Sequence, residues 1–229
     1  MLSPTSIEYL VQPAAGTALS FVVDVDRPPR RGALPVWTEM GQHRCEGCPV
    51  DASHCPAAAD LAPVVDALKD VLSVDRVAVT VRWGGRELRK ETDSQELVQS
   101  LVGLILASSA CPTLRRMKPL AALHQPFASF EETLFRAVGL HLIRAFFDNT
   151  DGRAADFALE DLRCHYDNVA RVNRGLANRV RSLGAGDAGV NGLIKLFSIG
   201  VLVSDELEDR LEGLRALVAA PSSTATEWG

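Results

Sequence analysis

Four of the five cysteines stand in a pattern that is typical of metal ligands. Cys45 and Cys48 form a Cys-x-x-Cys pair, in which two residues separate the cysteines. Cys55 follows, and Cys111 lies farther along the chain. Two thiolates at this spacing can bind one soft cation from a single turn, and the glycine between them eases the backbone around the metal. We therefore predict a metal site made of Cys45, Cys48, Cys55 and Cys111.

The metal and its fourth ligand are less constrained by the sequence. Cys111, His43 and His54 are the candidates for the fourth position, and Cys111 is favoured. His54 is the weakest because its neighbour Cys55 would have to bind from the adjacent backbone position. Zinc is expected, since it takes four sulfur or nitrogen ligands in a tetrahedron. The alternatives are an iron–sulfur cluster, although the spacing fits neither ferredoxin pattern, and thiols without metal.

A second group of reactive residue types is Cys111, His124 and Glu131. A thiolate near an imidazole can act as a nucleophile with its base. A structural interpretation is favoured, because Ser129 and Glu132 match the spacing of a helix capping box and His124 lies in a proline-rich turn. An enzyme that uses Cys111, His124 and Glu131 is therefore the alternative function, and catalysis is not the preferred one.

A third group is polar and lies on the last two expected helices. Its members are Tyr166, Asn173, Arg179, Asp187 and Asn191. Such side chains can line a pocket between helices, as in a helical-bundle sensor of a small ligand. A hydrogen-bond network that fixes the register of two helices is the favoured interpretation.

Charge and cysteine usage restrict the compartment and the partners. The net charge of -5 gives no general attraction to nucleic acid or anionic lipid. The short basic groups around Arg27, Arg30 and Arg31 and around Arg115, Arg116 and Lys118 are expected to be solvated loop charges. The first residues lack the pattern of a secretory signal, and an odd number of cysteines favours thiols that are free or metal-bound. We expect a cytoplasmic protein without nucleic acid or membrane partners, whose partner is an unknown protein or a second copy of itself.

Hydrophobic periodicity predicts an α+β fold. Alternating apolar residues indicate strands over 7–11, 19–25, 77–83 and 87–90, with Gly84-Gly85 at a two-residue hairpin turn. Helical periodicity begins at Pro56 and recurs over 94–109, 129–148, 154–182 and 187–219. We predict two β-hairpins in a small mixed sheet with a covering helix, packed on a C-terminal bundle of about four helices.

The same patterns give a division of the chain. Residues 1–93 form a β-hairpin and cysteine-loop region, residues 94–220 form the helical bundle, and the two make one integrated domain. Residues 221–229, small and polar, are expected to be a flexible tail.

Several short motifs together resemble a known family. They are Trp37-Thr38, Cys45-x-x-Cys48-Pro49, Cys55-Pro56, Ser108-Ser109-x-Cys111-Pro112, His124-x-Pro126-Phe127, Glu131-Glu132 and Asp187-x-x-x-Asn191. The series looks like a family of uncharacterised bacterial proteins known as a domain of unknown function. The resemblance spans most of the chain and implies one integrated architecture, without an activity or a ligand set. Our hypothesis is a bacterial cytoplasmic interaction or regulatory protein in which zinc serves as a structural clip.

Overall fold

The N-terminal part of the chain folds into one four-stranded sheet. In the computed structural model, which describes residues 5–14, 16–183 and 207–219, the strands are β1 (Ser6–Pro13), β2 (Leu19–Asp24), β3 (Arg76–Trp83) and β4 (Arg86–Asp93). Their order is β2-β1-β3-β4, and every neighbouring pair is antiparallel. The α+β class is confirmed, but the expected mixed sheet is wrong. The two hairpins meet through β1 and β3, which run in opposite directions, so no parallel pair arises.

The turn between β3 and β4 has the conformation that its sequence requires. Gly84 and Gly85 both have positive φ, at 50° and 76°, between the paired residues Trp83 and Arg86. A two-residue hairpin turn with both central φ angles positive matches the right-handed twist of the strands, and glycine adopts it without steric cost. The predicted hairpin is confirmed.

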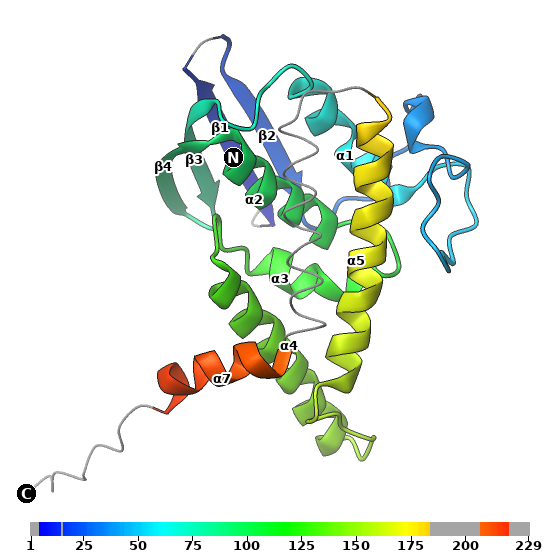
Figure 1. Cartoon of the computed structure of the whole chain (residues 1–229), viewed down its shortest axis with the longest axis vertical. Helices are drawn as coiled ribbons and strands as arrows, with labels where there is room; N and C mark the ends of the chain where they lie inside the picture. Colours follow the sequence, from blue (N-terminus) through cyan, green and yellow to red (C-terminus); the bar gives the residue numbers. More distant parts are fainter. Residues whose placement is uncertain (1–4, 15, 184–206, 220–229) are drawn as a thin grey trace, which may run out of the picture.

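One face of the sheet is buried beneath helices. Alternate residues of the two central strands point into the core, among them Tyr9, Val11, Val79 and Val81, which are 0–2% exposed. Helices α1 (Pro56–Ala67) and α2 (Ser94–Ala107) contribute to the same hydrophobic cluster, and so does a third helix, α5 (Glu160–Arg181). Figure 1 shows α2 lying across the sheet. The sequence pattern predicted one covering helix, the one that begins at Pro56, and the core also includes α2 and α5.

Shorter and later helices complete the described chain. They are the 3-10 helices η1 (Val36–Thr38) and η2 (Leu114–Met117), and the α-helices α3 (Lys118–Ala122), α4 (Phe130–Thr150) and α7 (Leu207–Val218). A second hydrophobic cluster joins α4, α5 and α7 through residues such as Leu134, Leu162 and Leu207. Among the described helices, none is both long enough and apolar enough to cross a bilayer.

The N-termini of α4, α2 and α5 are each set by a local feature of the backbone or of the capping residue. The capping box of α4 is confirmed, because the Ser129 hydroxyl accepts from the Glu132 backbone N–H and the Glu132 carboxylate accepts from the Ser129 N–H. Helix α2 is capped by Asp93, whose carboxylate accepts from the Glu96 backbone N–H. Helix α5 begins at Glu160 rather than near residue 154, because Leu159 has a left-handed backbone with φ of 65°. Residues 187–206 of the last expected helix lie outside the described residues.

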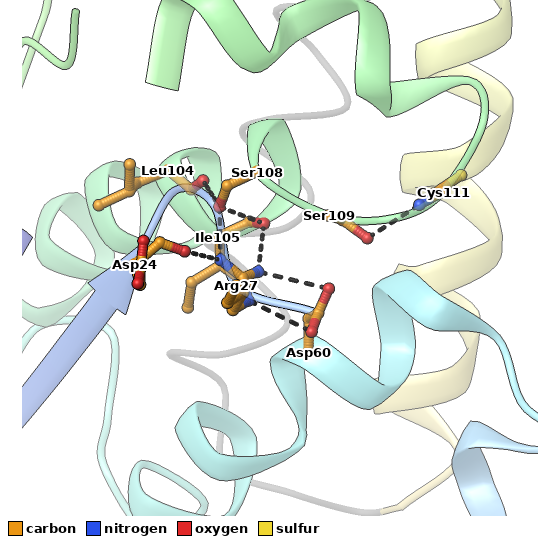
Figure 2. A network of polar contacts seen from close by, with 8 residues as sticks. All are labelled: Asp24, Arg27, Asp60, Leu104, Ile105, Ser108, Ser109 and Cys111. Carbon is orange, nitrogen blue, oxygen red and sulfur yellow. Dashed lines mark hydrogen bonds and ion pairs between the residues drawn. The ribbon is translucent and has the colours of Figure 1, made fainter. Parts of the chain in front are cut away.

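A partly buried arginine, Arg27, holds the corner from which the cysteine loop departs (Figure 2). The Arg27 guanidinium forms an ion pair with Asp60 of α1, with an Nη2–Oδ2 distance of 3.3 Å. It also donates to the Ser108 hydroxyl at 2.6 Å and to the Ile105 carbonyl at 3.0 Å, both at the end of α2. The expectation that Arg27 is a solvated loop charge is therefore wrong. A charge with so few solvent contacts needs a carboxylate and several acceptors, and Arg27 finds them by joining β2, α1 and α2.

Candidate metal site of the cysteine loop

The segment between β2 and α1, here called the cysteine loop (residues 25–55), places Cys45 and Cys48 on one turn. The Cys48 N–H donates to the Cys45 carbonyl at 3.2 Å, and Gly47 has a φ of 68°. Glycine is favoured at the third position of such a turn because that position requires positive φ. The Arg44 guanidinium donates to the Cys48 carbonyl at 3.1 Å and to the Val50 carbonyl at 2.9 Å. The turn thus presents its two thiols from a fixed backbone.

The other two thiols come from helix boundaries. Cys55 is the N-cap residue of α1, and its N–H donates to the Thr38 carbonyl at 2.7 Å. Cys111 follows α2, and its N–H donates to the Ser109 hydroxyl at 3.2 Å (Figure 2). Both residues are 6% exposed and belong to the main hydrophobic cluster, against which Cys45 and Cys48 pack as partly buried neighbours.

The four thiols influence one another electrostatically. Burial, together with smaller effects of the neighbouring thiols of Cys55, Cys48 and Cys111, raises the pKa of Cys45 to about 11. Burial also raises the pKa of Cys111, against the opposing effect of the Leu114 and Thr113 backbone N–H groups, which hydrogen-bond to it; Cys55 and Cys48 again add to the rise. Residues that are up to 66 positions apart in the sequence therefore share one environment, with N–H donors already turned toward one sulfur.

The same thiols are not arranged as a coordination sphere. Within residues 5–14, 16–183 and 207–219, no three Cys, His, Asp or Glu side chains form a group that can hold one metal ion. The predicted metal site of Cys45, Cys48, Cys55 and Cys111 therefore stays a prediction. Of the alternative ligands, His54 already uses its Nδ1 in a 2.8 Å hydrogen bond with the Thr38 hydroxyl.

Helix α5 closes over the cysteine loop through a buried arginine. Arg179 is 1% exposed, and its Nη1 donates to the carbonyls of Trp37 and Glu39 at 2.9 and 2.6 Å. No carboxylate pairs with Arg179 in the described part of the chain, and its Nε has no partner there. Its positive charge acts on the Cys45 thiol, where it opposes the larger effect of burial and lowers the pKa.

The sequence assigned Arg179 to the wrong neighbours. We grouped it with Tyr166 and Asn173 in an interhelical network, but its contacts are with the cysteine loop. The Tyr166 hydroxyl and the Asn173 Oδ1 are buried without a hydrogen-bond partner among the described residues. Asp187 and Asn191, the other expected members, lie outside those residues. The available signal for Arg179 was its place between Leu176 and Val180 on the apolar side of α5, where a solvated arginine is unusual.

The proposed catalytic residues of the alternative function have other partners. The His124 Nε2 lies 2.6 Å from the Tyr9 hydroxyl, which is also 2.7 Å from the Ser100 hydroxyl. Ser100 in turn accepts from the Phe127 N–H at 3.0 Å. This chain of hydrogen bonds fastens the His-x-Pro-Phe loop to α2 and to β1, one of the two central strands of the sheet. No hydrogen bond among the described residues joins His124 to Cys111, and the electrostatic neighbours of Cys111 are thiols.

A cavity of about 720 Å³ lies beside the cysteine loop but does not contain its thiols. It is lined by loop residues such as Arg30 and Trp37 and by α1 residues such as Ala62 and Asp66. Its size is in the range of small-molecule sites. The walls carry both signs of charge and leave the chemical class of a ligand open, so the cavity does not favour one function.

We predict that Gly175→Ala loosens the contact between α5 and the cysteine loop. An added Cβ would lie 2.9 Å from the Cys45 sulfur and 3.3 Å from the His43 carbonyl oxygen, which is closer than side chains normally approach. Although alanine favours helices, this overpacking should lower the free energy of unfolding by about 1–2 kcal/mol. Urea denaturation measures the change.

Gly139→Ala in α4 is the matched control, because a Cβ there meets no atom within 4 Å. That variant should gain about 0.5–1 kcal/mol from the better helix propensity of alanine. If both glycine variants are stabilised alike, α5 does not press on the loop as described.

We predict that His124 makes the folded protein less stable as the pH falls. Burial lowers the pKa of His124 to about 3, with a smaller contribution from Arg136. The unfolded chain therefore binds a proton at this ring below about pH 6.5 that the folded chain does not bind until about pH 3. As the pH drops from about 6.5 to about 3, this residue should therefore lower the free energy of unfolding by up to about 1.4 kcal/mol per pH unit.

Urea denaturation at a series of pH values, on the wild type and on His124→Gln, measures this contribution. The variant should show a shallower pH dependence by up to one proton. Equal slopes for the two proteins would mean that His124 is not held neutral.

The family to which the chain belongs can now be stated. Comparison with curated proteins and with solved structures finds no match to this chain. A family model with the description "Domain of unknown function (DUF6901)" matches residues 7–219, which include the sheet, the cysteine loop and the described helices. The protein is therefore a member of the DUF6901 family.

Proposed function

We propose that this protein is a non-catalytic interaction protein whose cysteine loop is held by zinc. Cys45, Cys48, Cys55 and Cys111 would bind the metal as thiolates and clip the loop to the ends of α1 and α2. The observation that supports this most is the set of neighbours of Cys45, which are the other three predicted ligands and Arg179. The proposal requires the four sulfurs to move to about 2.3 Å from one ion.

The protonation of the thiols fits a metal-dependent site. With a pKa of about 11, Cys45 is a neutral thiol at pH 7 and is not activated as a nucleophile. A metal ion binds thiolates and releases their protons, so a site with a high thiol pKa forms when metal is present and weakens in acid. The raised pKa thus favours a structural thiol over a catalytic one.

The charge of the site favours the same conclusion. Zinc with four thiolates carries a net charge of about -2, by the formal charges of its ligands. Arg179 is a buried cation that bonds only to carbonyls among the described residues. A buried charge is costly without an opposite charge nearby. A thiolate-bound metal next to Cys45 would supply that charge, and hydrogen bonds to the sulfurs are a usual second layer around such a metal.

A separate surface supports the interaction role. The outer side of α4 exposes five large apolar residues, and we call it the α4 face: Phe135, Leu142, Ile143, Phe146 and Phe147. Beside it, α4 and α7 enclose an apolar groove of about 540 Å³ lined by residues such as Phe135, Val138, Leu142 and Leu214. Figure 1 shows α4 and α7 extending away from the sheet. An exposed apolar patch of this kind is typical of a binding surface.

We propose a second copy of the chain as the occupant of the α4 face. Phe146 and Phe147 project with exposures of 59% and 57%, and the apolar groove lies one to three turns away on the same helix. A projection and a groove on one surface are self-complementary, because a two-fold axis places each projection opposite the groove of the partner. No charged pair is needed to hold such a contact.

We predict that Cys48→Ser loses bound zinc and stability together. Wild-type protein expressed with zinc should contain about one zinc per chain and lack visible colour, whereas colour would indicate the iron–sulfur alternative. Because assembly of a metal site is coupled to folding, the variant should lose about 3 kcal/mol, or roughly 10 °C in melting temperature.

Cys164→Ser is the control for this experiment, since Cys164 is exposed on α5. It should change neither metal content nor melting temperature. Elemental analysis and thermal unfolding provide the two measurements, and treating wild-type protein with a chelator checks the result if Cys48→Ser does not fold. Zinc absent from wild type, or equal stability of both serine variants, would contradict the clip.

We predict that Phe146→Asp weakens self-association. A charge placed in a buried apolar contact should weaken the dimer by about tenfold or more, by analogy with the usual energy of a central aromatic residue. Light scattering at a series of protein concentrations measures the mass. Leu72→Asp changes an exposed apolar residue after α1 and should leave association unchanged. Monomeric wild type at all concentrations would show that the α4 face has another occupant or none.

A further inference from the structure

A small cavity lies where η2 and α3, α4 and α5 meet, away from the cysteine loop. Its volume is about 20 Å³, enough for one small ion or one oxygen atom of a larger one. The apolar part of its wall comes from Met117, Leu120, Ala137, Leu140 and Leu162. The polar part consists of Arg116, His141, Arg144, His165 and Tyr166.

Two buried side chains in this wall have no hydrogen-bond partner. The Nε2 of His165 and the hydroxyl of Tyr166 are both unpaired among the described residues, although the two residues are only 7% and 2% exposed. Their rings are in edge contact, with centroids 5.7 Å apart. An unpaired buried polar group is costly, so two of them beside one cavity indicate that the cavity holds a partner for both.

The charges around the cavity are positive. The guanidinium of Arg144 donates to the Arg116 carbonyl at 2.6 Å, which fixes its position beside Arg116. Neither arginine forms an ion pair with a carboxylate in the described part of the chain. Burial, together with smaller effects of Arg116 and Arg144, lowers the pKa of His165 to about 4. The imidazole is therefore neutral at pH 7 and can donate from Nε2.

The other titratable groups near the cavity have partners of their own. The Asp156 carboxylate lies 3.2 Å from the Nε2 of His141, which also contacts the Asp156 carbonyl at 2.7 Å, and it accepts the Asp161 N–H at 2.8 Å. Arg136, an electrostatic neighbour of Tyr166, adds a further positive charge and donates to the carbonyls of Leu120 and Leu123. The cavity thus brings together a neutral imidazole, a phenol and two guanidinium groups, all of which can donate.

We propose that this cavity is a binding site for a small inorganic anion, held by Arg116, Arg144, His165 and Tyr166. An anion accepts hydrogen bonds from all four donors and places a negative charge beside the two guanidinium groups, which a water molecule cannot do. The volume fits a chloride ion, or one oxygen of a compact oxyanion such as phosphate whose remainder faces solvent. The site does not depend on the zinc clip, because none of its residues belongs to the cysteine loop.

Chloride binding can be measured on the intact protein. Sodium chloride replaces sodium gluconate at constant ionic strength, since gluconate is too bulky for the cavity, and the chloride-35 NMR line width reports bound ion. A parallel series with sodium phosphate, read by the melting temperature, tests the oxyanion. We expect saturable binding of one of these anions and a rise of the melting temperature with its concentration.

Variants assign the binding to the cavity. Arg144→Gln and Tyr166→Phe should each weaken it about tenfold or more, the usual effect of losing a hydrogen bond to a charged group. If Arg144→Gln does not fold, Arg116→Gln, which changes an exposed guanidinium, replaces it in the binding measurement. Arg115→Gln, one residue away and outside the cavity wall, is the matched control. Failure of both anions to act beyond gluconate, or an equal loss in Arg115→Gln, would overturn the proposal.

Discussion

The contact between α5 and the cysteine loop is the constraint on which the arrangement of the two parts of the chain depends. A helix can approach a loop this closely only where it lacks side-chain bulk, and Gly175 provides that position against Cys45. One turn later, Arg179 donates to the loop carbonyls of Trp37 and Glu39. A loop with little regular structure of its own is thereby held by side-chain hydrogen bonds from a helix more than 120 residues away.

This contact also explains why the thiols share one environment. Arg27 and Asp60 hold the beginning of the loop against α1 and α2, and Cys55 begins α1 at its end. With both ends fixed, α5 presses the middle of the loop toward the end of α2, where Cys111 follows. The loop is therefore positioned by charges and carbonyl contacts before any metal is considered, and zinc would add to this arrangement instead of creating it.

Local sequence patterns predicted the secondary-structure elements, whereas the tertiary contacts between these elements became known only from the structure. The Gly84-Gly85 turn and the capping box of Ser129 and Glu132 depend on a few neighbouring residues, so the sequence predicts them well. The partners of Arg27 and Arg179 come from elements distant in the sequence, and no spacing rule connects them. The same limit applies to the cysteines, because spacing identifies ligand types but does not say how near the sulfurs lie to one another.

The second hydrophobic cluster differs from the first in what it leaves uncovered. The sheet cluster is enclosed by three helices, whereas α4 has one side in the cluster with α5 and α7 and the other side exposed. Its inner side buries Leu134 and Ala137 beside Arg144, which lines the small cavity, and its outer side exposes Phe146 and Phe147. A helix that is apolar on two sides departs from the usual pattern of a monomer, in which one apolar stripe faces the core and the opposite face is polar. This departure is explained if a partner covers the outer face, while a bound anion would accompany Arg144 on the inner side, so the two proposals for α4 concern opposite sides of one helix.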